Sequence, residues 1–150
     1  MENLDIHYFG EVQLSYQRKK SQITKITSSR MASDYIRSLY PEGQINHRES
    51  MYVIYLNNSN KIIGYYHLSS GGITGTLVDV RLVFQGALLT NSVAMILAHN
   101  HPSGTLKASS ADKAITKKIS IAGESLDIKL LDHIIVTEDS YFSFADENLL

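Results

Sequence analysis

The sequence of 150 residues contains no cysteine. Disulfide bonds and thiolate zinc ligands are therefore excluded, and a metal site would have to be built from histidine and carboxylate side chains. The sequence also lacks any apolar run that approaches the about 18 residues of a membrane-spanning helix, and no signal-peptide pattern stands near its beginning. We therefore expect a cytoplasmic protein that does not associate with membranes.

A basic excess is missing as well, since the formal net charge is −1. Proteins that bind nucleic acid on their own usually carry such an excess, because neutralising phosphates supplies most of their affinity. The local basic groups are Arg18-Lys19-Lys20 and the cluster of Lys113, Lys117 and Lys118. The lysine cluster is the best argument for an anionic partner, but the overall charge does not support DNA as that partner.

The length fits one domain that is large enough to bury a core, and no repeat, low-complexity tract or linker divides the chain. We expect residues 1–27 to form an N-terminal extension and residues 28–150 to form the domain. Hydrophobic periodicity and turn residues predict helices over 28–39, 77–89 and 109–122. They predict strands over 10–16, 22–26, 49–56, 61–68, 93–98, 127–136 and 141–144. This pattern favours one α/β domain in which helices sandwich a sheet.

Buried helix faces are also predicted from the spacing of apolar residues. The residues expected to face the core are Val80, Phe84, Ala87 and Leu88 in the second helix, and Ala111, Ile115 and Ala122 in the third. Thr76 and Asn91 are expected to cap the two ends of the second helix. Lys113 and Lys117 are expected to stay in solvent.

Two histidines stand at the end of the apolar run that begins at Val93. Residues i and i+2 of an extended chain face the same side, so His99 and His101 can direct their rings at one point. A turn at 102–104 can then bring back the carboxylate of Asp112. Two imidazoles and one carboxylate, with a fourth position open, form the ligand set of a catalytic zinc. However, Ser109 and Asp112 also have the spacing of a capping box, so this pattern alone leaves a purely structural role open.

These residues form a longer pattern: His-x-His, seven residues, then Ser-x-x-Asp. It resembles the JAMM motif of the JAB1/MPN metalloprotease superfamily. The segments His99-Asn-His-Pro-Ser-Gly104, Leu130-Leu-Asp-His-Ile-Ile-Val136 and Ser143-Phe144 are similar to its RadC branch, whose members have been labelled DNA-repair proteins. The resemblance covers roughly residues 28 to 146 and implies a JAB1/MPN-like fold with a mixed β-sheet.

The resemblance also implies roles for single residues. His99, His101 and Asp112 would hold Zn²⁺, and Ser109 would donate a hydrogen bond to the oxyanion of the tetrahedral intermediate. Glu49 stands where the superfamily has its general base, immediately before an apolar strand. Glu42 is close enough in the sequence to remain a second candidate for the base.

The remaining histidines are expected to lie outside the site. Asp132 and His133 belong to the RadC-like closing strand, and we expect them to support the ligands or pack in the core, because the three-ligand set is already complete. His7, His47 and His67 are expected to be incidental.

The activity implied by the resemblance is a zinc-dependent peptidase or isopeptidase that uses a metal-activated water on a protein or peptide substrate. One alternative is a DNA-repair or DNA-processing accessory protein of the RadC type. Another is a non-catalytic zinc-containing interaction module. The set of three ligands, a base and an oxyanion donor argues against the latter, because a structural zinc needs a fourth protein ligand and no base.

Overall fold

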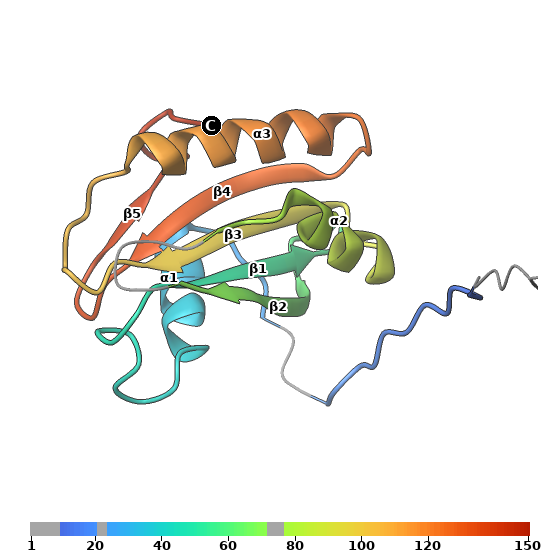
Figure 1. Ribbon diagram of the computed structural model, residues 1–150, viewed down its shortest axis with the longest axis horizontal. Coiled ribbons are helices and arrows are strands. Elements are labelled where there is room, and N and C mark those ends of the chain that lie inside the picture. The colour runs from blue at the N-terminus through green and yellow to red at the C-terminus, as the bar shows by residue number, and fades with distance from the viewer. Residues whose placement is uncertain (1–9, 21–23, 72–76) are drawn as a thin grey trace, which may run out of the picture.

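The computed structural model describes residues 10–20, 24–71 and 77–150. Figure 1 shows one sheet with helices on both of its faces. The helices are α1 (Ser29–Ser38), α2 (Val80–Leu89) and α3 (Ser110–Glu124). The strands are β1 (Ser50–Leu56), β2 (Ile62–Ser70), β3 (Ala94–Asn100), β4 (Lys129–Val136) and β5 (Tyr141–Ser143). Among these described helices, none has the length and apolar character needed to cross a membrane.

Strand β3 occupies the centre of the sheet, whose order is β2-β1-β3-β4-β5. It runs antiparallel to β1 and parallel to β4, while the two outer pairs are antiparallel. Helix α3 provides the crossover connection that a parallel pair requires. The predicted α/β domain with a mixed sheet is therefore confirmed, and every residue of β3 is buried, as a central strand with covered faces requires.

The two faces of β3 pack against different helices, because successive side chains of a strand point to opposite sides. Ile96 and Ala98 join the core beneath α1. Met95 and Leu97 join the core beneath α2 and α3. This arrangement confirms that helices sandwich the sheet, and it places His99 on the same face as α3 by the same alternation.

The ends of the first two helices follow ordinary capping chemistry. Ser28 is the N-cap of α1, as predicted. Helix α2 begins later than predicted, at Val80, because Asp79 is its N-cap; the proposed cap Thr76 lies outside the described residues. Asn91 follows α2 with a left-handed φ of 52°, which confirms the predicted stop.

The predicted buried face of α2 is only partly correct. Phe84 and Ala87 are buried, together with Val83. Val80 is partly buried and packs against this core. Leu88 is 56% exposed, so its prediction was wrong. Leu88 lies about 100° around the helix from Ala87, which turns it away from the sheet.

In α3 the inward face is more polar than the sequence pattern predicts. The buried residues are Asp112, Thr116, Ile119 and Gly123. Ala111 is exposed, which contradicts its prediction, whereas Ile115 and Ala122 are partly buried against the core, as expected. Counting apolar residues shifts the predicted inward face of α3 by one residue, because two positions on the true inward face, Asp112 and Thr116, are polar.

The predicted strand at 10–16 does not form. Residues 10–20 are exposed and carry no regular secondary structure, although the Tyr16 hydroxyl donates a hydrogen bond to the Ile63 carbonyl. Of the predicted strand at 22–26, the described part makes an isolated antiparallel bridge between Lys25 and Lys61; residues 22 and 23 lie outside the described ranges. Alternating residues need a partner strand, and the segment 10–16 has none among the described residues.

Candidate metal centre

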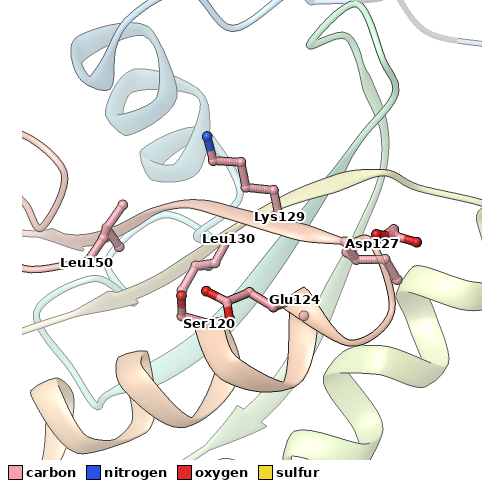
Figure 2. A pocket seen from close by; sticks show the side chains of 8 residues that line it. Ser120, Glu124, Asp127, Lys129, Leu130 and Leu150 are labelled. Carbon is pink, nitrogen blue, oxygen red and sulfur yellow. The ribbon is translucent and has the colours of Figure 1, made fainter.

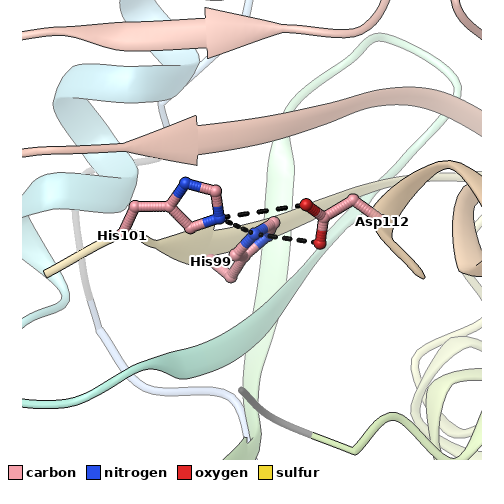
Figure 3. A group of neighbouring side chains, drawn as sticks. All are labelled: His99, His101 and Asp112. Carbon is pink, nitrogen blue, oxygen red and sulfur yellow. Dashed lines mark hydrogen bonds and ion pairs between the residues drawn. The ribbon is translucent and has the colours of Figure 1, made fainter. Parts of the chain in front are cut away.

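Three side chains from the C-terminal end of β3 and the start of α3 converge on one point (Figure 3). The Nε2 atoms of His99 and His101 are 2.9 Å apart. The Oδ1 atom of Asp112 lies 3.3 Å from the Nε2 atom of His99. One ligand atom from each of the three residues lies within 4.8 Å of the others, so this group could hold a metal ion.

The backbone between these residues is shaped by a tight turn. The His101 N–H donates to the carbonyl of Val136, which extends the β3–β4 pairing past the end of β3. The N–H of Gly104 then donates to the His101 carbonyl at 2.9 Å. Gly104 has a φ of +79°, a left-handed conformation that glycine adopts without strain. The turn sends the chain back toward the sheet and into α3.

Ser109 and Asp112 form the predicted capping box at the start of α3. The Ser109 N–H donates to Oδ2 of Asp112 at 2.7 Å, and the Asp112 N–H donates to the Ser109 hydroxyl oxygen at 3.0 Å. The Ser109 hydroxyl donates to the same Oδ2 at 2.7 Å. Oδ2 therefore stabilises the helix start while Oδ1 faces His99, so the capping role and a ligand role are compatible.

The ring of His101 is oriented by a backbone carbonyl. Its Nδ1 lies 2.6 Å from the carbonyl oxygen of Thr105. A carbonyl can only accept, so Nδ1 carries the hydrogen, and in the neutral ring Nε2 keeps its lone pair. This lone pair faces His99 and Asp112, which is the orientation that a metal ligand requires.

His99 is completely buried, and burial lowers its pKa to about 4. Asp112 partly opposes this shift, whereas His101 adds to it. The ring is therefore neutral near pH 7 and can offer a lone pair. Two imidazoles and a carboxylate, without any thiolate, match the donors that zinc accepts in catalytic sites.

Glu49 stands directly before β1, the strand that neighbours β3 in the sheet. Met51 pairs with His99, so continuing this antiparallel register places Glu49 opposite His101. Partial burial raises the pKa of the Glu49 carboxyl; His101 lowers it and Asp112 raises it. The Glu49 carboxyl thus experiences the charges of the candidate site. The other candidate base, Glu42, lies in the exposed turn after α1.

Asn100, between the two histidines, points to the opposite face and holds the segment that carries Glu49. Its Oδ1 accepts from the Ser50 N–H at 2.7 Å. Its Nδ2 donates to the carbonyls of Ile45 and Arg48 at 2.7 and 3.0 Å. The sequence pattern does not predict this role, and its only signal is a polar residue at the end of an apolar strand.

Asp132 and His133 support the site from β4, as expected. Asp132 accepts hydrogen bonds from the Ser143 hydroxyl and from the backbone N–H groups of His133 and Ala145. Burial raises the pKa of Asp132, while these bonds lower it. His133 is completely buried, stacks on Phe144 with ring centroids 4.6 Å apart, and contacts Nδ1 of His99 through its own Nε2 at 2.8 Å.

Of the other histidines, His67 and His47 are not members of the cluster found among the described residues. His67 stacks on Tyr52, with ring centroids 4.8 Å apart, and hydrogen-bonds the Ser70 hydroxyl. His47 is exposed in the turn after α1, and His7 falls outside the described residues. The described contacts of His67 and His47 thus give neither a place among the ligands.

A shallow hollow lies at the opposite end of α3 from Asp112 (Figure 2). Its lining includes Ser120, Glu124, Lys129 and Leu150. Ser120 stands about 12 Å along the helix axis from Asp112. This hollow is therefore separate from the candidate metal centre.

Comparison with known proteins identifies the class of this domain and then its family. An α/β domain with a His/His/carboxylate cluster at the end of its central strand fits the JAB class, and the family described as RadC-like JAB domain matches residues 26–149. The chain belongs to this family.

Three relatives illustrate how far the similarity extends. A UPF0758 protein of Flavobacterium johnsoniae is 52% identical over 128 residues, which cover 85% of this chain and 55% of the relative. One of Porphyromonas gingivalis is 45% identical over 126 residues, 83% of this chain and 54% of the relative. The UPF0758 protein YfjY of Escherichia coli is 41% identical over 124 residues, 83% of this chain and 76% of the relative. The chain spans about half the length of the first two relatives.

Proposed function

We propose that the domain is a zinc-dependent hydrolase of the JAMM type that cleaves peptide or isopeptide bonds. The observation that carries the proposal is the convergence of His99, His101 and Asp112 next to the half-buried carboxyl of Glu49. His99, His101 and Asp112 would hold the zinc, and a zinc with three protein ligands would lower the pKa of a bound water to about 7.

Glu49 is suited to move the proton. Its carboxyl has a raised pKa because it is partly buried, and a raised pKa makes the carboxylate a stronger base. In this proposal Glu49 takes the proton from the attacking water and delivers it to the leaving amine. General acid–base catalysis of this kind typically contributes 10²- to 10⁴-fold, about 3–5 kcal/mol of the barrier.

Ser109 stands at the exposed edge of the site, and its hydroxyl now donates to Asp112. In the proposal a rotation about its Cβ–Oγ bond redirects this hydrogen to the oxyanion of the tetrahedral intermediate, while Oγ stays in place as the helix cap. Removing one such donor typically costs about 3 kcal/mol of transition-state stabilisation. The Ser109 N–H would keep its bond to Asp112 throughout, so the carboxylate would stay oriented.

The number of candidate ligands also argues against the alternative of a non-catalytic zinc-containing interaction module. A closed structural zinc site needs four protein ligands. The cluster found among the described residues offers three, from His99, His101 and Asp112. This supports a site with room for water and substrate.

The test separates metal binding from proton transfer. We expect the wild-type chain to bind about one zinc per monomer and to lose it in His101→Ala and Asp112→Asn, measured by plasma mass spectrometry. Glu49→Gln should keep its zinc but cleave a panel of fluorogenic peptides and isopeptides about 10²- to 10⁴-fold more slowly. Glu42→Gln is the matched control and should match the wild type. The hydrolase proposal fails if Glu49→Gln strips the zinc or if the wild-type chain binds none.

A further inference from the structure

A chain of three hydrogen bonds leads from His99 into the interior and returns to the third member of the cluster. Nδ1 of His99 lies 2.8 Å from Nε2 of His133. Nδ1 of His133 lies 2.7 Å from the hydroxyl of Thr116. The Thr116 hydroxyl donates to the backbone carbonyl of Asp112 at 2.6 Å. This relay, Thr116–His133–His99, therefore connects two candidate ligands through residues that would not touch the metal.

The direction of hydrogen donation along the relay follows from its last hydrogen bond, between Thr116 and the backbone of Asp112. A backbone carbonyl can only accept, so the single hydroxyl hydrogen of Thr116 is committed to Asp112. The Thr116 oxygen can then only accept from His133. Nδ1 of His133 must therefore carry a hydrogen.

The next step uses the surroundings of His133. Its ring is completely buried, and its two nitrogens contact a hydroxyl and another imidazole rather than a carboxylate. A buried charge without a counter-ion is costly, so the ring is neutral and carries one hydrogen. Nε2 of His133 is then an acceptor, and Nδ1 of His99 must donate to it.

We infer that Thr116 and His133 are positioning residues that fix His99 as its Nδ1–H tautomer and thereby present its Nε2 lone pair to a metal ion. The inference rests on the proposed function, because it assigns the metal to the same cluster. If the relay were reversed, Thr116 would donate to His133, and the hydrogen would end on Nε2 of His99. That hydrogen would occupy the position of the metal.

The relay also fixes where the ligands lie relative to one another. His133 stands on β4, where it pairs with Leu97 of the neighbouring strand β3. Thr116 stands one turn after Asp112 on α3 and is 1% exposed. The hydrogen bonds thus join β3, β4 and α3 directly beneath the cluster. Ligand-orienting partners of this kind typically contribute 10- to 100-fold to metal affinity.

A matched pair of variants tests the relay. Thr116→Val keeps the shape of the side chain and removes the hydroxyl, whereas Thr116→Ser keeps the hydroxyl and removes a methyl. We expect Thr116→Val to weaken zinc binding about 10- to 100-fold in competition with a chromophoric chelator. Thr116→Ser should keep the wild-type affinity, and thermal unfolding checks that each variant folds. Equal affinities for all three proteins, or equal losses in both variants, would overturn the inference.

A second measurement needs no variant. Long-range ¹H–¹⁵N correlation spectra of the imidazole rings distinguish the two neutral tautomers, and we expect His133 to be the Nδ1–H form with and without zinc. An Nε2–H form of His133 would overturn the relay. The tautomer measurement distinguishes failure of the relay from failure of the proposed function. If the wild-type chain does not bind zinc, the proposed function fails, but the tautomer of His133 still tests the relay.

Discussion

The side-chain oxygen of Asn100 accepts a hydrogen bond from the backbone N–H of Ser50, the residue after Glu49, at 2.7 Å. Asn100 stands between His99 and His101. The end of β3 therefore directs two candidate ligands to one face and the Asn100 side chain, which anchors the segment that carries Glu49, to the other. The position of the proposed base relative to the candidate ligands is therefore set by three consecutive residues of the chain, His99, Asn100 and His101.

Asn100→Ala tests this anchor. The substitution leaves one partly buried N–H and two carbonyls without their amide partner, so we expect the free energy of unfolding to fall by about 2–5 kcal/mol in urea titrations. Zinc content should persist in the folded variant, because both histidines remain. Asn58→Ala, in an exposed turn, is the matched control. A variant as stable as this control would show that the anchor contributes little.

The metal-free protein should lose stability as the pH falls from about 6.5 toward 4. Burial lowers the pKa of His99 to about 4 and that of His133 well below its ordinary value of 6.5. In this interval the unfolded chain binds more protons than the folded chain, so the free energy of unfolding rises with pH. Each fully shifted histidine contributes up to about 1.4 kcal/mol per pH unit. Urea titrations in the presence of a chelator measure this slope.

The matched variants His133→Gln and His47→Gln isolate this effect. Glu49 and Asp132 have raised pKa values, which oppose the trend at pH values above their ordinary 4.5 and 3.8. The informative quantity is therefore the difference between variant and wild type. We expect a shallower slope in His133→Gln and an unchanged slope in His47→Gln. Identical slopes in all three proteins would contradict the buried neutral histidines.

Ser109→Ala separates the two roles of the serine. Loss of the N-cap should reduce the free energy of unfolding by about 1 kcal/mol, measured by chemical denaturation. Zinc should be retained, whereas turnover of any substrate found should drop about 10²- to 10³-fold. Ser110→Ala, at the next exposed position, is the control. If Ser109→Ala lost stability but kept full turnover, the serine would be a helix cap alone.

Duplex DNA should bind weakly to this domain. The net charge of −1 offers little counterion release, so we expect a dissociation constant weaker than about 1 μM near physiological salt. Fluorescence anisotropy with a labelled duplex measures it. Replacing Lys113, Lys117 and Lys118 together by glutamine should change this value little. A sub-micromolar constant that this triple variant abolishes would support the DNA-processing alternative.

The cluster of His99, His101 and Asp112 could be predicted because all three come from one strand–turn–helix segment. The alternation of side chains along a strand and the spacing of a capping box both depend only on residues that are close together in the sequence. Together they bring these three side chains to one place. That the three bind zinc stays a prediction. His133 is 34 residues away from His99, and their contact depends on the pairing of β3 with β4. The contact between His133 and His99 therefore could not be predicted from the spacing of residues in the sequence.

The misplaced face of α3 has a related cause. Periodicity assigns apolar residues to the interior, so it predicts that Ala111 is buried and gives no reason to bury Thr116. In the structure Asp112 and Thr116 face inward because their polar atoms are satisfied at the site, by Ser109 and His133. The hydrophobic pattern of the sequence therefore predicts burial incorrectly at the candidate site.

The alternation along β3 has a consequence for how the family can diverge. The candidate ligands His99 and His101 occupy odd-numbered positions. Asn100, between them, faces the other side and hydrogen-bonds the segment before β1. A single inserted or deleted residue near the end of β3 would exchange these faces and send the imidazoles toward α1. Homologous sequences should therefore vary by substitution in this strand while showing no gaps there, and length changes should gather in the turns on either side.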